Sequence, residues 1–264
     1  MSQDGSESSV ISEQLAAVRT ELRRERQRTA DELEALKSFE HRLQKIETAS
    51  ISHCLYPNQV VLTDASTSTG DLAQVREAYE STIMSVDHYT DEYDDTYCQS
   101  LQEEFSHNIA VALTDGTVFN ERCKQATLSA VTASISAREL LIDDIYVELE
   151  SISDAAETLV PLAEELDELR SVSFRNCSFG ALDAYRSRLK ILENKCETVS
   201  NQRQVTIFEM RRPQCISMEV ADITQYFYQD LKVSYPVISS IVGLVAVITE
   251  LRHQIERAMT VCRP

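Results

Sequence analysis

The stretch that decides the fold is LSAVTASISARELLIDDIYVELESISDAAETLVPLAEELDELR, residues 128–170. Steps of three and four residues from Leu128 meet apolar side chains at eleven of thirteen positions, the exceptions being Arg138 and Arg170. A helix that buries one face along its whole length has this pattern, and its persistence over about six heptads is typical of a coiled-coil seam. Pro161 lies off that face, so we expect it to kink the helix without ending it. The stretch predicts one long helix over 120–170.

A second long helix is predicted over 179–210, because the same spacing resumes there. Its apolar face comprises Leu182, Tyr185, Leu189, Leu192, Cys196, Val199, Arg203, Thr206 and Met210. The connection SVSFRNCSFG, residues 171–180, is short and favours an antiparallel pair. Five glycines, five prolines and no tryptophan also suit long helices better than a sheet. We therefore predict an all-α fold: a long antiparallel coiled-coil hairpin with additional helices packed on it as a bundle.

The remaining elements follow from the same pattern. We expect a tail over 1–8, a charged helix over 9–48, a Ser- and Thr-rich linker over 49–70, and the bundle over 71–264. Within the bundle, short helices are expected over 71–87, where Asp71 and Gln74 resemble a capping box, and over 89–113. Two helices, 217–232 and 236–260, close the chain. The buried face of the last is expected to hold Ile238, Ile241, Val245, Ile248, Ile255 and Met259.

The charge is strongly acidic, with 43 Asp and Glu against 25 Lys and Arg, a formal net charge of −18. Arginines also outnumber lysines by 19 to 6. A carboxylate surface holds water in strong brine, where the Debye length falls to about 3 Å and self-repulsion is screened. The start, MSQDGSESS, has neither the basic residues nor the apolar run of a secretory signal. We expect a halophilic protein located in the cytoplasm.

Patterns of catalytic residues are missing from the sequence. The seven cysteines lie at least 19 residues apart and form no C-x-x-C unit, and neither a G-x-S-x-G motif nor a Gly-rich loop is present. His53 and Cys54 are adjacent, but they lie in the predicted linker without an orienting partner. We predict no catalytic residue, no cofactor and no enzymatic activity.

The most acidic stretch is SVDHYTDEYDDTYCQSLQEEF, residues 85–105. Drawn as one helix, it places His88 with Asp91, Glu92 and Asp95 on one face and three tyrosines on the other. The expected interaction residues on that second face are Tyr89, Tyr93 and Tyr97. The alternative is a metal- or ligand-binding sensor, since His88 with Glu92 or Asp95 has the spacing of a ligand pair. Two ligands on an exposed helix make a weak site, so we predict no metal.

Two E-x-x-H pairs, Glu104 with His107 and Glu250 with His253, make up half of a ferritin-like di-iron centre. Such a centre needs every ligand to point into the core. On the last helix the apolar face predicted above leaves both members of the second pair facing solvent. The spacing is therefore interpreted as a chance feature of acidic helices.

The only basic cluster, RTELRRERQR at residues 19–28, suggests nucleic acid, but glutamates are interleaved with its arginines. Five phosphate contacts would also lose on the order of 10⁶ in affinity between dilute and molar salt. We predict instead that Arg23 and Arg24 belong to a docking surface for an acidic helix, in a homodimer or with another protein partner. A membrane-associated alternative rests on VSYPVISSIVGLVAVIT, residues 233–249, but Pro236, Ser239, Ser240 and Gly243 favour a buried helix.

Several blocks carry a resemblance. They are DELEALKSFEHRL at 31–43, QVREAYESTIMSVDHYTDEYDDTYCQSLQEEF at 74–105, VFNERCKQATLSAV at 118–131, FGALDAYRSRLKILENKCETVSNQRQ at 179–204 and YFYQDLKVSYPVI at 226–238. In this order they resemble an uncharacterised haloarchaeal family of acidic, helical proteins, a domain of unknown function. The resemblance implies a halophilic archaeal origin and brings no activity. The sequence predicts a non-catalytic structural or protein-interaction module.

Overall fold

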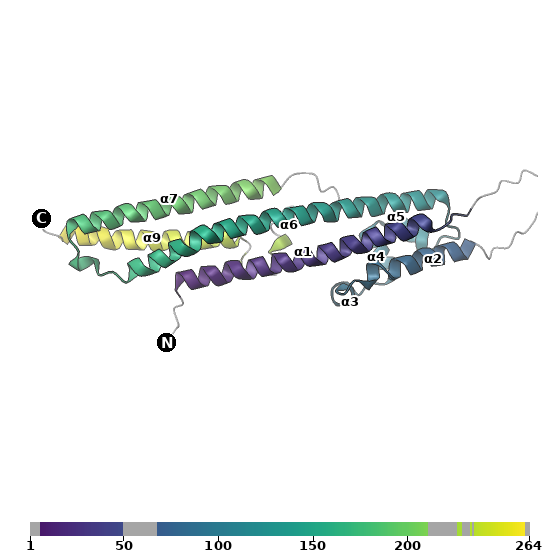
Figure 1. Ribbon diagram of the computed structural model, residues 1–264, viewed down its shortest axis with the longest axis horizontal. Helices are drawn as coiled ribbons and strands as arrows, with labels where there is room; N and C mark the ends of the chain where they lie inside the picture. Colours follow the sequence, from purple (N-terminus) through teal and green to yellow (C-terminus); the bar gives the residue numbers. More distant parts are fainter. Residues whose placement is uncertain (1–5, 50–67, 211–225, 229–232, 234, 262–264) are drawn as a thin grey trace, which may run out of the picture. The chain divides into compact units, whose positions relative to one another are not determined.

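The computed structural model describes residues 6–49, 68–210, 226–228, 233 and 235–261, and this part of the chain is helical without strands (Figure 1). The all-α prediction is confirmed. The predicted linker and most of the predicted helix over 217–232 lie outside the described residues.

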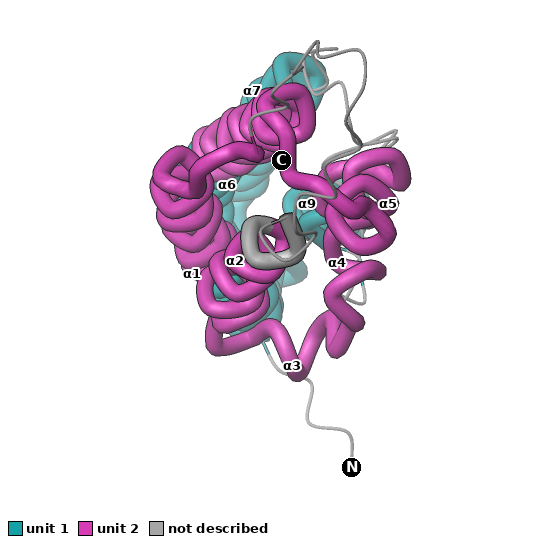
Figure 2. Tube along the Cα trace, turned by 90° about the vertical axis from the view of Figure 1, so that its right-hand side faces the viewer, with its two compact units in different colours: residues 1–25, 144–264 teal, residues 26–143 magenta. Residues whose placement is uncertain are grey.

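The chain divides into two compact units (Figure 2). Unit 1 comprises residues 1–25 and 144–264, and unit 2 comprises residues 26–143. Both boundaries fall inside long helices, α1 (Glu7–Lys45) and α6 (Glu121–Arg170). α6 runs through Pro161 as the sequence led us to expect.

Short helices fill the middle of unit 2: α2 (Ser68–Glu80), η1 (Ile83–Ser85), α3 (Tyr89–Glu92), α4 (Tyr97–Glu104) and α5 (His107–Thr114). The single helix predicted over 89–113 is therefore wrong. Thr96 caps α4 in a capping box with Gln99, Ser106 caps α5, and Asp94 between α3 and α4 has φ of 45°. Each cap satisfies backbone N–H groups that a continuous helix would have bonded, so the chain restarts twice. The capping box predicted at Asp71 is also wrong, since α2 begins at Ser68.

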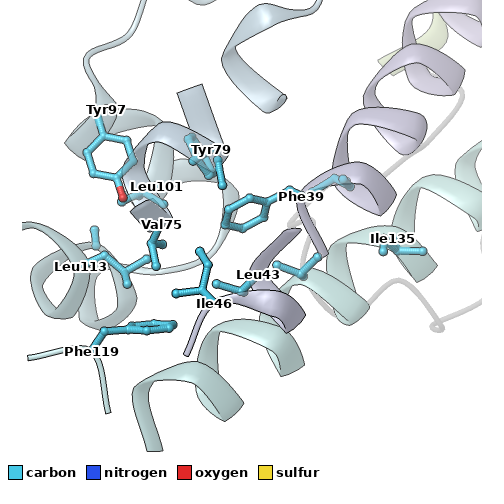
Figure 3. Packing of buried hydrophobic residues seen from close by; sticks show 14 residues of the cluster. Phe39, Leu43, Ile46, Val75, Tyr79, Tyr97, Leu101, Leu113, Phe119 and Ile135 are labelled. Carbon is cyan, nitrogen blue, oxygen red and sulfur yellow. The ribbon is translucent and has the colours of Figure 1, made fainter. Parts of the chain in front are cut away.

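The core of unit 2 is aromatic and aliphatic (Figure 3). The Tyr79 ring packs edge-on against Phe39 and Tyr97, with centroids 5.3 and 5.5 Å away. Each large apolar side chain buried here contributes roughly 1.5–3 kcal/mol. Around this core, α1 and α6 run antiparallel, because Lys37 bonds Glu139 at 2.7 Å while Lys124 bonds the Ile46 carbonyl at 2.7 Å.

Unit 1 holds the second half of α6, then η2 (Phe174–Asn176), α7 (Phe179–Met210) and α9 (Pro236–Val261). α7 packs most closely along α9 (Figure 1), and Glu193 joins them through Arg252 at 2.9 Å. Glu165 bridges α6 to α7, accepting from Arg188 at 2.5 and 2.7 Å. The coiled-coil form of the predicted hairpin is not confirmed, because α7 finds its closest partner in α9.

The buried faces in unit 1 follow the predicted spacing with a local shift. On α7, seven of the nine expected positions are buried and Tyr185 is half-buried, but Ile207 rather than Thr206 enters the core after Arg203. On α9, Ile241, Ile248 and Ile255 are buried as expected. The rest of the α9 face is made by Val237, Leu244, Val247 and Leu251 in place of Ile238, Val245 and Met259.

The ion pair between Arg203 and Glu148 is fully buried in unit 1. The Arg203 guanidinium donates to both oxygens of Glu148. The side chain of Arg203 is 3% exposed and that of Glu148 is 0% exposed. The same guanidinium donates to Ser151 Oγ at 3.0 Å and to the Tyr228 hydroxyl at 3.3 Å. Burial raises the pKa of Glu148, and the Arg203 hydrogen bond and charge partly oppose that shift.

Candidate functional site

The three tyrosines predicted as interaction residues do not share one face. Tyr89 and Tyr97 are both 7% exposed and belong to unit 2, where Tyr97 lies in the aromatic core. Tyr93 is 48% exposed, and its hydroxyl donates to Glu32 Oε1 at 2.8 Å. Since the chain restarts between α3 and α4, the continuous tyrosine stripe does not form.

A polar cluster surrounds Arg138 of α6. Its guanidinium donates to Glu104 Oε2 at 2.7 Å and to Glu32 Oε2 at 3.3 Å. Burial lowers the pKa of Arg138, but the two carboxylates outweigh it and hold the guanidinium charged. Burial raises the pKa of Glu104, and the charge of Arg138 partly opposes that effect.

The predicted histidine site has a different partner from the one expected. His88 Nε2 lies 3.2 Å from Glu32 Oε1 of α1, and Glu92 pairs with Arg28. Among the described residues, no three His, Cys, Asp or Glu gather closely enough to hold a metal ion. His88 is thus part of the Arg138 cluster.

A pocket of about 190 Å³ opens beside this cluster, wholly within unit 2. Its lining comes from α1, η1, α3, α4 and α6, together with residues just outside them. It includes Tyr89 and Glu104, although the Tyr89 hydroxyl and Glu104 Oε1 are themselves closed off from solvent. Charged and apolar side chains meet at this pocket, so it is the candidate ligand site.

The two E-x-x-H pairs are not equivalent. Glu250 and His253 are exposed, as the helix geometry led us to expect. Glu104 is largely buried against Arg138 while His107 is exposed, so this pair is divided between the core and solvent. His53 and Cys54 lie outside the described residues.

Arg23 and Arg24, the other predicted interaction residues, are exposed on α1, and Arg24 lies 3.9 Å from Glu21. The apolar helix is α9, which is long and apolar enough to cross a membrane by length and composition alone, and is the sole such helix in the described chain. Under half of its most apolar window is buried in the structure. Core helices of soluble proteins pass the same test, so this is weak evidence for a membrane.

The outward face of α7 is a feature that we did not predict. Opposite its buried face, seven exposed residues repeat at steps of four and three and carry no charge. This outer stripe comprises Ser187, Ile191, Asn194, Thr198, Asn201, Val205 and Phe208. Ile191, Val205 and Phe208 are 47%, 56% and 78% exposed. In a chain of net charge −18, an uncharged heptad stripe over most of a helix is unexpected for a surface exposed only to water.

Both buried arginines, Arg138 and Arg203, have a signal in the sequence. Arg138 and Arg203 both interrupt apolar seams, and a buried guanidinium requires a buried acid. Those acids, Glu104 and Glu148, lie off the predicted seams, so spacing alone does not locate them.

Comparison with known proteins gives one family. No curated protein and no solved structure matches the chain. The family model described as Domain of unknown function (DUF7260) matches residues 13–252, which is most of the sequence. The chain belongs to this family, the domain of unknown function DUF7260.

Proposed function

We propose that this chain is a non-catalytic structural and protein-interaction module that pairs with a second copy of itself through the outer stripe of α7. The observation that carries the proposal is the uncharged, exposed heptad repeat of that stripe. Apolar and small polar residues at heptad spacing pack between helices, and this face is unoccupied by the described residues.

The composition of the stripe suits a second copy in particular. Ile191, Thr198 and Val205 are β-branched and occupy alternate positions, where they can pack into the spaces between side chains of a facing helix. Asn194 and Asn201 lie on either side of Thr198, so in an antiparallel pair Asn194 of one copy lies toward Asn201 of the other, and paired asparagines at such positions select the register. An unrelated partner would need a matching polar pattern, whereas a second copy already has it.

The flanking charges favour an antiparallel arrangement. Lys190 and Lys195 border the N-terminal half of the stripe, and Glu209 borders its C-terminal end. In an antiparallel pair the lysines of one α7 lie toward Glu209 of the other. In a parallel pair like charges would face each other.

We also propose that the module acts in the cytoplasm of a cell with molar salt. Two chains of net charge −18 repel each other strongly in dilute buffer. At about 1 M salt the Debye length is about 3 Å, and that repulsion is screened while apolar contacts are retained. Pairing is expected to strengthen as KCl rises, which light scattering at increasing KCl measures.

The test of the pairing surface compares two identical substitutions in molar KCl. Val205→Glu places a carboxylate in the stripe, where pairing would bury it against the partner helix without a compensating cation. A desolvation cost of about 3 kcal/mol raises the dissociation constant about a hundredfold. Val242→Glu on α9 is the control, since Val242 is 64% exposed and lies outside the stripe. A monomer for the first variant and a dimer for the second support the proposal. Equal effects of both, or a monomeric wild type, contradict it.

A further inference from the structure

The inner five positions of the outer stripe of α7 carry the same residue types when they are followed from either end. Thr198 lies at the centre, and the spacing alternates between four and three residues in both directions. Asn194 and Asn201 are the first positions on either side of it. The next positions, Ile191 and Val205, are both β-branched and lie seven residues from the centre. A second α7, laid antiparallel with Thr198 on a two-fold axis, therefore sets amide against amide and apolar against apolar.

The two outermost positions of the stripe differ in size. Phe208 is 78% exposed and is the bulkiest side chain of the stripe, whereas Ser187 at the other end is the smallest. In the arrangement centred on Thr198, Phe208 of each copy lies toward Ser187 of the other. Ala184, the next exposed residue at the same spacing, is also small and leaves room for the ring. The large end of one helix thus fills the space beside the small end of the other, as close packing requires.

The same arrangement brings one flank of each α7 against itself. Across a two-fold axis, a residue near the axis meets its own equivalent on the second copy. One flank of the stripe holds Lys190, Glu197 and Gln204, and Glu197 is exposed and one residue from the centre. Lys190 does not offset its charge, since the Lys190 ammonium donates to Glu193 at 3.0 Å. Two Glu197 carboxylates therefore face each other beside the axis, and like charges placed opposite each other are destabilising.

We propose that α7 pairs antiparallel about Thr198, and that the two facing Glu197 side chains make this pairing dependent on salt. In dilute buffer the repulsion between the two carboxylates opposes association. At about 1 M salt the Debye length falls to about 3 Å and that repulsion is screened, while the apolar contacts of Ile191 with Val205 remain. This inference rests on the proposed pairing of two copies and adds its register and its regulation.

Cysteine cross-linking in molar KCl tests the register. Two copies of Thr198→Cys should form a 198–198 disulfide under a mild oxidant, because the two residues face each other across the axis. Ile191→Cys is the matched control: its two copies lie about 14 residues apart along the pair, about 21 Å, whereas a disulfide needs Cα atoms within about 7 Å. Peptide mass mapping separates the new disulfides from any made by the native cysteines of the wild type. A dimer that forms the 191–191 disulfide, or lacks the 198–198 disulfide, overturns the proposed register.

Light scattering over a dilution series, at about 0.1 M and about 1 M KCl, tests the regulation. Glu197→Gln should pair about fivefold more tightly than the wild type in the dilute salt, with the ratio approaching one in molar salt. Glu157→Gln is the control, because it makes the same change in net charge at an exposed position of α6 and should have the weaker effect. Equal effects of both variants overturn the role of Glu197 and leave the pairing itself intact. A wild type that has the mass of one chain at both salt concentrations overturns the pairing and this inference together.

Discussion

The buried Glu148–Arg203 pair offers the sharpest test of the packing in unit 1. Arg203→Met removes the guanidinium that donates to both oxygens of the fully buried Glu148 carboxylate, and leaves its charge without compensation. Breaking such a pair from one side costs about 3–5 kcal/mol. Replacing both members, with Glu148→Leu added to Arg203→Met, removes the stranded charge. The double variant is expected to recover most of the loss, because apolar residues of similar size replace buried ion pairs at little cost.

Urea unfolding followed by far-UV circular dichroism measures these free energies at constant KCl. Arg188→Met is the control, since Arg188 pairs with Glu165 at the surface and is expected to change the free energy of unfolding far less. The loss in Arg203→Met should also shrink as pH falls, because burial raises the pKa of Glu148 and its protonation removes the uncompensated charge. An Arg203→Met variant as stable as Arg188→Met, or a double variant no better than the single one, would refute the reasoning.

Three further predictions follow from local geometry. Glu193→Gln is expected to lower the free energy of unfolding by no more than about 1 kcal/mol at neutral pH. Hydrogen bonds from Arg252 and Lys190 lower the pKa of Glu193. In urea melts, the difference between this variant and the wild type should therefore disappear as pH falls through that lowered pKa. Gly116→Ala is expected to destabilise the protein by about 1–3 kcal/mol, because the added Cβ would lie 2.2 Å from the Ala112 carbonyl oxygen. Gly180→Ala is the control: its Cβ meets nothing within 4 Å, so thermal melts should show it to be neutral or stabilising. Burial raises the pKa of Cys196 to about 11, so iodoacetamide should alkylate the exposed Cys98 first and Cys196 only on unfolding. Peptide mass mapping measures the order, and early alkylation of Cys196 would contradict its burial.

Helix positions came from the sequence wherever apolar spacing is long and regular. α6 and α7 bury Ile145, Ile152, Leu189 and Leu192 on the predicted faces, because an apolar stripe that is regular over many turns defines a single buried face of the helix. The acidic stretch was misjudged because the helical wheel assumes one continuous helix. Thr96 competes for the backbone N–H groups there and begins a new helix.

The candidate site could be predicted only in part. His88 and Tyr93 were singled out, and the structure places both near Glu32. Their contacts come from α1, far away in the sequence, and spacing within one helix carries no information about another element. Arg138 was visible as an interruption of the seam, but its acids on α1 and α4 are fixed by tertiary packing alone.

The central claim, that the outer stripe of α7 joins two copies, is tested most directly by the molar mass in solution. Multi-angle light scattering in molar KCl should give twice the chain mass for the wild type and for Val242→Glu, and the chain mass for Val205→Glu. A wild-type protein that has the mass of one chain in the same experiment would contradict this claim.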